Sequence, residues 1–219
     1  MKFFTVLTSL GAKERLALSF RHMNDDPQNH IRVIPPLLRR EVTLHEPYSG
    51  DYIHGYMVNA GFSENVMKWH RQHPRIPLRF FWDKWEEEPV KRVDNTLSFY
   101  QLDDVEFLRQ MAGCKAYAST AGFESVCEAM YLGKPILMVP AHIEQDCNAY
   151  DAEKSGAGII SSDFNLQQLL EFAKDYHPNR DFVYWVRGAE YTLLSLLESD
   201  SSNCQQVLFN EMYLVEEFI

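Results

Sequence analysis

Residues 115–140 read KAYASTAGFESVCEAMYLGKPILMVP, and this stretch decides the fold class. It contains a short strand candidate at Lys115–Ala118, a run with helical apolar spacing at Phe123–Leu132 and a wholly apolar run at Ile136–Val139. Gly133-Lys134-Pro135 should end the helix, because glycine favours helix C-termini and proline cannot continue a helix. A wholly apolar strand is typical of the middle of a parallel sheet covered on both faces. The stretch therefore predicts a strand-helix-strand unit.

The same alternation extends in both directions from this unit. Toward the N-terminus we expect strands at Tyr52–Val58, Leu78–Trp82 and Thr96–Phe99, and helices at Ser63–His73 and from the N-cap Asp103 to Ala112. Toward the C-terminus we expect helices at Glu144–Ser155 and Leu166–Tyr176 around a strand at Gly158–Ile160. The charged segment Asp83–Asp94 should be a solvated loop. This pattern predicts an α/β fold, a Rossmann-like doubly wound parallel sheet.

The two ends of the chain do not fit this alternation. Ala12–Met23 is predicted to be a helix, and the polar run Asn24–His30, the extended Ile31–Ile34 and Pro35-Pro36 that follow are typical of a linker. Two C-terminal helices are expected, joined by the polar loop Ser199–Asn203, at Asp181–Glu198 and Gln205–Glu217. We therefore divide the chain into a linker with the remnant of a preceding domain (1–45), a ligand-binding domain (46–180) and C-terminal helices (181–219).

Composition excludes several classes of function. The 21 Lys and Arg residues against 31 Asp and Glu give a net charge of -10, which disfavours nucleic acid as a partner. No run approaches the roughly 18 apolar residues of a membrane span. The cysteines lack CxxC or zinc-finger spacing and are interpreted as reduced thiols of a cytoplasmic protein: Cys114, Cys127, Cys147 and Cys204.

Three turns that follow strands carry groups suited to a ligand. In a doubly wound sheet, ligands bind beyond the carboxyl ends of the strands. The first turn is Asn59-Ala60-Gly61, whose small residues let a ligand approach the backbone, although turn geometry alone also explains a glycine there. The third is His142–Asp146, where Glu144 is either a ligand for hydroxyl groups or a first-turn charge on an exposed helix.

The second turn, Ser119–Ser125, is the most informative of the three. The amides at the start of the following helix would bind a phosphate, assisted by hydroxyls of Ser119, Thr120 or Ser125. One helical turn further on, Glu128 could accept hydrogen bonds from both hydroxyls of a ribose. The alternative for the hydroxyls is simple capping of the helix.

The sequence from Ser119 to Pro135 resembles the donor-site signature of GT-B glycosyltransferases. Pro140, Glu144-Gln145, Asn148-Ala149 and Gly156-Ala157-Gly158 continue the pattern of the group containing UDP-glucuronosyltransferases and the bacterial N-acetylglucosaminyltransferase that makes lipid II. The resemblance is strong over 97–160 and weaker over 52–82. The segment Val33–Val42, with Pro35-Pro36-Leu37-Leu38-Arg39, is similar to the interdomain linker of one prokaryotic branch of such transferases.

The resemblance implies a role for each turn in binding a UDP-sugar donor. Glu128 would bind the ribose, and Glu124 departs from the small or polar residues common at its position. The other implied roles are binding of the diphosphate by Asn59, Gly61, Thr120, Ala121, Gly122 and Ser125, of the base by Tyr100 and Gln101, and of the sugar by Glu144 and Gln145. The chemistry would be an inverting displacement whose general base belongs to an N-terminal acceptor domain, so no catalytic residue is assigned in this chain.

Neither a metal nor any cofactor besides the donor substrate is expected. The sequence contains no Asp-x-Asp motif, and His70 and His73 form an H-x-x-H pair without a nearby third ligand. The acceptor would be bound mostly by the missing or separate N-terminal domain, and any peripheral membrane association would also go through that half.

Two other functions stay open at this point. One is a UDP-sugar 2-epimerase, although the Glu-Gln-x-x-Asn-Ala run favours a transferase. The other is a non-catalytic nucleotide-binding or interaction module, for which an exposed former domain interface would favour a homodimer.

Overall fold

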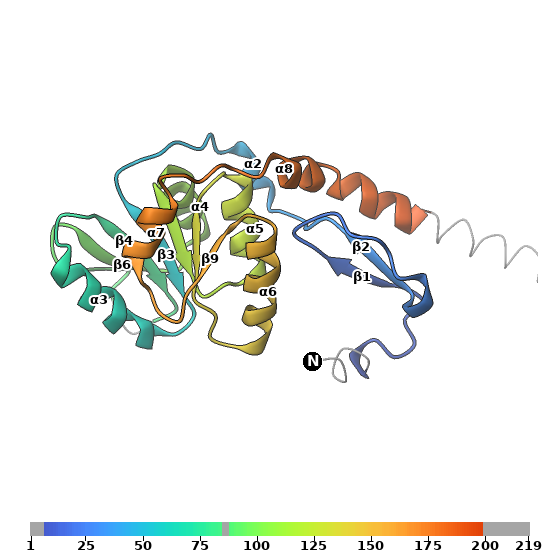
Figure 1. Ribbon diagram of the computed structural model, residues 1–219, viewed down its shortest axis with the longest axis horizontal. Coiled ribbons are helices and arrows are strands. Elements are labelled where there is room, and N and C mark those ends of the chain that lie inside the picture. The colour runs from blue at the N-terminus through green and yellow to red at the C-terminus, as the bar shows by residue number, and fades with distance from the viewer. Residues whose placement is uncertain (1–6, 85–87, 199–219) are drawn as a thin grey trace, which may run out of the picture. The chain divides into compact units, whose positions relative to one another are not determined.

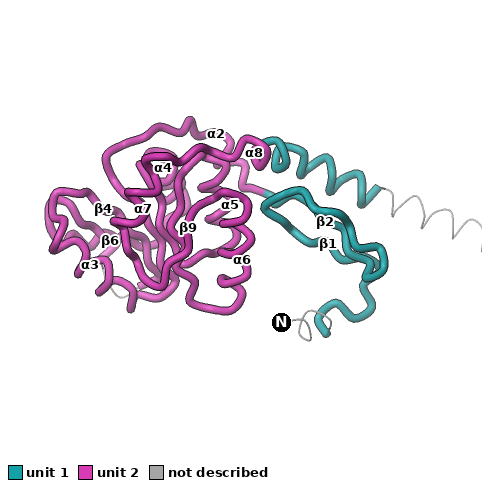
Figure 2. Tube along the Cα trace, viewed as in Figure 1, with its two compact units in different colours: residues 1–37, 184–219 teal, residues 38–183 magenta. Residues whose placement is uncertain are grey.

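The computed structural model describes residues 7–84 and 88–198, which form two compact units. The larger unit is Leu38–Val183, and the smaller unit combines the described parts of Met1–Leu37 and Tyr184–Ile219 (Figure 2). The predicted loop Ser199–Asn203, helix Gln205–Glu217 and Cys204 lie outside the described residues.

A seven-stranded sheet forms the centre of the larger unit (Figure 1). The strand order is β5-β6-β4-β3-β7-β8-β9, and every pair is parallel except β5 with β6. Without β5, this is the order 3-2-1-4-5-6 of doubly wound nucleotide-binding folds. The strands are β3 (Ile53–Met57), β4 (Leu78–Trp82), β5 (Val90–Arg92), β6 (Leu97–Gln101), β7 (Ala116–Ser119), β8 (Ile136–Met138) and β9 (Gly158–Ile160).

Helices cover both faces of this sheet. On one face, α3 (Ser63–Gln72) and α7 (Leu166–Phe172) contribute to a core cluster with the sheet residues Ile53, Phe80 and Leu137. On the other face, Phe107 of α4 (Asp104–Gly113) packs its ring edge-on against the alternate residues of β3 and β4. Helices α5 (Phe123–Tyr131) and α6 (Ile143–Lys154) contact each other, and α5 also contacts β7 and β8 (Figure 1). The predicted α/β class is confirmed.

The strand-helix-strand unit at residues 115–140 ends its helix as its sequence predicts. Gly133 adopts a left-handed φ of 66°, and its N–H donates to the carbonyl of Met130. The N–H of Lys134 donates to the carbonyl of Ala129, which completes a Schellman motif. The chain can therefore turn at once into the buried strand β8.

Two predicted elements are wrong. The segment Asp83–Asp94 is not only a loop, because it contains β5, which pairs with β6 and places Val90 opposite Tyr100. The predicted helix Ala12–Met23 instead contains strand β1 (Arg15–Leu18), which pairs in parallel with β2 (Ile31–Ile34). In both cases pairing with the next strand along the chain overrides local preference.

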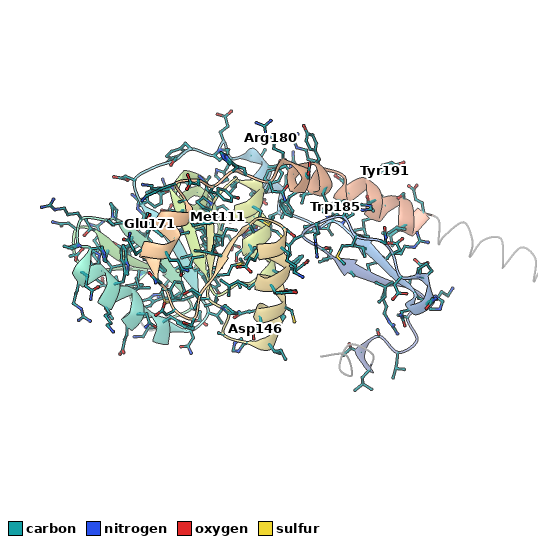
Figure 3. All side chains as sticks on the ribbon, in the orientation of Figure 1. Met111, Asp146, Glu171, Arg180, Trp185 and Tyr191 are labelled. Carbon is teal, nitrogen blue, oxygen red and sulfur yellow. The ribbon has the colours of Figure 1, made fainter. Side chains whose placement is uncertain are left out.

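The smaller unit contains this strand pair and C-terminal helical residues. A single turn, η1 (Pro27–Asn29), lies between β1 and β2. Helix α8 spans Arg180–Arg187, of which the residues from Tyr184 onward belong to the smaller unit, and residues 189–198 are also helical. Within this unit the indole Nε1 of Trp185, a residue labelled in Figure 3, donates to the carbonyl of Ser19 at 3.0 Å. This contact ties residues near the start of the chain to a helix near its end.

Candidate functional site

The candidate site lies where β3 and β7 are neighbours in the sheet. After β3 the chain continues to β4 on one side, and after β7 it continues to β8 on the other side. Connections that diverge in this way leave a crevice beyond the carboxyl ends of the two strands. The two loops that follow the strands meet there, because the N–H of Val58 donates to Oγ1 of Thr120 at 3.4 Å. The first two predicted turns are therefore brought together.

A pocket of about 260 Å³ opens beside this junction. It joins the end of β3, the start of α4, the start of α5 and the short segment before α2 (Arg40–Leu44). The pocket is lined by Arg39, Tyr56, Leu102, Asp104, Phe107, Gly122, Phe123, Glu124, Ser125 and Glu128.

The turn into α5 has unusual backbone geometry. Ala121 has a φ of 60°, a left-handed conformation that residues with a side chain rarely adopt and that is often found at functional sites. Oγ of Ser119 accepts from the N–H of Ala121, and Oγ1 of Thr120 accepts from Val58, so neither hydroxyl caps α5. The N-cap is Gly122, where no described side chain makes a capping hydrogen bond. The start of α5 thus presents the positive end of a helix to the pocket.

Glu128 lies one turn into α5 and is 1% exposed. Both of its carboxylate oxygens accept from the guanidinium of Arg39, Oε1 from Nε at 2.7 Å and Oε2 from Nη2 at 2.9 Å. Burial raises the pKa of Glu128, and the hydrogen bonds from Arg39 oppose that rise. A buried carboxylate facing a pocket is an acceptor for two donors at once.

The same guanidinium meets two further carboxylates. Nη1 of Arg39 lies 3.2 Å from Oδ1 of Asp104, and Nε lies 3.8 Å from Oε1 of Glu124. The hydrogen bond to Glu128 is the main reason why the pKa of Arg39 is raised. Among the described residues that line the pocket, three are acidic and Arg39 is the one cation. The favourable electrostatic interactions of a bound anionic ligand would therefore come from the backbone amides at the start of α5 and from Arg39.

Comparison with known proteins identifies the family. A family model described as Glycosyl transferase family 1 matches residues 10–176, which is more than half of the chain. The chain belongs to glycosyl transferase family 1.

Two solved glycosyltransferase structures resemble this family 1 chain. The glycotransferase of kitacinnamycin matches with a TM-score of 0.56 at 14% identity, over 80% of this chain and 50% of that one. CalG4, the calicheamicin glycosyltransferase, matches with a TM-score of 0.56 at 13% identity, over 78% of this chain and 48% of that one. These similarities confirm the predicted GT-B-type fold.

A curated relative is also detected. The putative UDP-glucuronosyltransferase ugt-48 of Caenorhabditis elegans is 26% identical over 105 residues, which are 47% of this chain and 20% of the relative. The family 1 chain thus spans about half the length of the solved structures and a fifth of this relative.

The structure places the predicted diphosphate residues in two groups. Gly122 and Ser125 line the pocket of the family 1 chain, and Thr120 and Ala121, which precede Gly122 in the same turn, are buried and are not among its described lining residues. Asn59 uses Oδ1 to accept from the N–H of Gly61 at 2.8 Å, which begins the turn η2 (Ala60–Phe62). Asn59 and Gly61 are not among the described residues that line the pocket.

The residues predicted to bind the base and the sugar also lie outside the described pocket lining. Tyr100 stacks on Phe81 with ring centroids 5.0 Å apart and lines a second pocket of about 250 Å³. Its neighbour Gln101 ends β6, one residue before the pocket residue Leu102. Glu144 is exposed in the first turn of α6, and Gln145 turns its Oε1 back to accept from the N–H of Ala141 at 2.8 Å.

Sequence reasoning missed Arg39 as a site residue. It lies 89 positions before Glu128, and local spacing cannot pair positions so far apart. The one available signal was its place at the end of the Pro-Pro-Leu-Leu-Arg segment. Tyr56 and Phe107 were missed because aromatic residues at these spacings usually indicate core.

The histidine pair is structural. Nε2 of His70 lies 2.8 Å from Oδ2 of Asp94, and Nδ1 of His73 lies 3.0 Å from the carbonyl of Trp69. Across residues 7–84 and 88–198, no group of three or more His, Cys, Asp or Glu side chains is arranged to hold a metal ion. In the same ranges, no helix combines the length and apolarity needed to cross a membrane.

Proposed function

We propose that this chain binds a nucleotide-diphosphate sugar at the pocket between β3 and β7 and acts as the donor-binding part of a glycosyltransferase. The observation that carries the proposal is Glu128, a carboxylate that is 1% exposed and faces a pocket at the start of α5. Arg39 already donates to both oxygens of Glu128. The support is therefore the position of this carboxylate in the pocket beside the start of α5, where its two oxygens could accept from two ribose hydroxyls in place of the guanidinium.

The diphosphate would lie at the start of α5. The Gly122 N-cap allows close approach, and Ser125, in the first turn of the helix, brings a hydroxyl to the pocket wall. In the transfer step an acceptor oxygen attacks the anomeric carbon, and the bond from that carbon to the diphosphate oxygen breaks with its electron pair. The helix N-terminus stabilises the negative charge left on the diphosphate. The acceptor proton would go to a base outside this chain, and inversion at the anomeric carbon follows from a single displacement.

Uracil is the proposed base, which the name of the C. elegans relative supports. Tyr100, Gln101, Glu144 and Gln145 keep their proposed roles with base and sugar, which require the bound donor to extend beyond the pocket lining. The acceptor-binding half is proposed to be a separate or preceding domain, and neither a metal nor a further cofactor is needed. Family membership favours a transferase over the 2-epimerase.

Saturation-transfer NMR and calorimetry with UDP test the proposal. Wild type should bind UDP, and Glu128→Gln should bind it about tenfold or more weakly, because a charged hydrogen-bond acceptor contributes ~1.5–3 kcal/mol. Glu144→Gln is the matched control, since its exposed side chain is assigned to the sugar, which UDP lacks. A folded wild type that fails to bind UDP would favour the non-catalytic module, and equal binding by Glu128→Gln would remove the ribose assignment.

A further inference from the structure

Arg39 covers the carboxylate that the proposed function assigns to ribose. Its Nε and Nη2 donate to the two oxygens of Glu128 at 2.7 and 2.9 Å, and the exposed fraction of Glu128 is 1%. A bidentate guanidinium and a pair of ribose hydroxyls would both approach this carboxylate from the pocket side. They therefore compete for the same acceptors.

We propose that Arg39 is a binding-site residue that exchanges partners: it occupies Glu128 before a nucleoside binds and is displaced from Glu128 by the two ribose hydroxyls. This inference rests on the proposed function. It adds Arg39 to the binding site, and it adds the free-energy cost of breaking the Arg39–Glu128 ion pair when a nucleoside binds. The number of hydrogen bonds to Glu128 stays at two through the exchange. What is lost is the ion pair, so the exchange lowers the affinity for the nucleoside.

The displaced guanidinium has anionic partners at the rim of the pocket. Asp104 lies 3.2 Å from Nη1 and its side chain is 77% exposed, while Glu124 lies 3.8 Å from Nε and its side chain is 66% exposed. Arg39 can therefore leave Glu128 without losing all its charge partners. Its own side chain is 28% exposed, and a shift toward the rim also recovers hydration.

Only the side chain needs to move. The carbonyl of Arg39 accepts from the N–H of Val42 at 3.1 Å at the start of α2, and Val42 is fully buried. This fixes the backbone beside the pocket. A long side chain that pivots on a fixed backbone can change partners while α2 stays in place.

Calorimetric titration with uridine tests the exchange, because uridine has the ribose but no phosphate that Arg39 could contact. The variants are Arg39→Met, Arg39→Lys and the control Arg40→Met, which removes the same charge from the adjacent, exposed position. Removing the guanidinium also removes the hydrogen bonds that oppose the burial-driven rise in the pKa of Glu128, so the titrations are run at pH 8 to favour the ionised carboxylate. Arg39→Met should bind uridine about 3- to 10-fold more tightly than wild type, because the ribose hydroxyls no longer compete with the guanidinium for Glu128.

Arg39→Lys keeps the charge but not the bidentate contact, so it should show a smaller gain, and Arg40→Met should match wild type. Circular dichroism checks that each variant folds. If Arg39→Met does not fold, Arg39→Lys is the variant that is compared with wild type. Unchanged or weaker uridine binding by folded Arg39 variants, with UDP still bound by wild type, would overturn the exchange alone. If wild type binds neither uridine nor UDP, the proposed function is overturned and the exchange with it.

Discussion

His54 and Tyr117 are register partners on β3 and β7, and their rings stack with centroids 5.3 Å apart and an interplanar angle of 21°. Phe107 and Phe81 pack edge-on against the same imidazole. His54 is fully buried in this aromatic layer, and burial is the main cause that lowers its pKa to about 3. Two of these rings, His54 and Tyr117, belong to β3 and β7, the two strands whose carboxyl ends lie beside the pocket.

The buried imidazole predicts sensitivity to acid. Between pH 6.5 and about 3 the unfolded chain protonates His54 but the folded protein does not, so stability falls as the pH drops. The expected slope from this group is up to ~1.4 kcal/mol per pH unit. Urea titrations across this range should show a smaller slope for His54→Leu than for wild type. An unchanged slope would mean that the imidazole gains a proton without unfolding.

Gly122→Ala separates phosphate binding from folding. A Cβ at this position would meet Oγ of Ser125 at 3.6 Å, an ordinary contact, and φ is −62°, so the variant should fold like wild type. The added methyl group projects at the N-cap, where the diphosphate is proposed to lie. Binding of UDP should weaken by several-fold, ~1 kcal/mol or more, while uridine binding stays the same. Equal losses for both ligands would place the methyl group against the nucleoside instead.

Lys134 stabilises the larger unit by a buried ammonium contact. Its Nζ donates to the carbonyls of Tyr48 at 2.7 Å and Cys114 at 2.9 Å, and the residue is 4% exposed. Lys134→Met leaves both carbonyls without this donor and should lower the free energy of unfolding by ~2–3 kcal/mol. Denaturant unfolding measures the change, with the exposed Lys174→Met as the control. A loss no larger than that of the control would show that water replaces the ammonium at little cost.

Gly133→Ala tests the end of helix α5. The left-handed φ of 66° strains any residue with a side chain, and a Cβ would lie 3.1 Å from Cγ of Pro178. Thermal unfolding should reveal a destabilisation of ~1–2 kcal/mol. Gly188→Ala, whose Cβ would meet the carbonyl of Trp185 at 3.6 Å, should be neutral by comparison. Similar melting temperatures for the two variants would contradict the strain argument.

The sequence predicts most of the larger unit, because most of its elements carry a local signal. The run Leu78–Trp82 matches β4 and Gly158–Ile160 matches β9, and Asp103 caps α4 by accepting from the N–H of Glu106 at 2.8 Å. By contrast, β1 and β5 become strands only through their partners, β2 and β6. The charged, proline-containing composition of residues 83–94 and the apolar spacing of residues 12–23 favour a loop and a helix, and only the pairing reveals the strands.

The residues of the candidate site also fall into those that local sequence predicts and those that only the folded chain reveals. Glu128 and the turn at Gly122 were predictable, because they lie within one continuous strand-turn-helix segment. Arg39 was not, since its role depends on a fold that brings residue 39 to residue 128. The orientation of Gln145, which turns back to the N–H of Ala141, also depends on local geometry that residue type does not reveal.

Strand β5 closes one side of the seven-stranded sheet with three residues, two of which are the cations Lys91 and Arg92. An outer strand with unpaired amides and carbonyls is a template on which other polypeptides can align and aggregate. A short outer strand that runs against its neighbour and carries exposed positive charge makes such growth costly, because each added strand would have to dehydrate those charges. The segment predicted to be a solvated loop thus gives a mostly parallel sheet a short, charged outer strand, a feature that disfavours fibrous self-association.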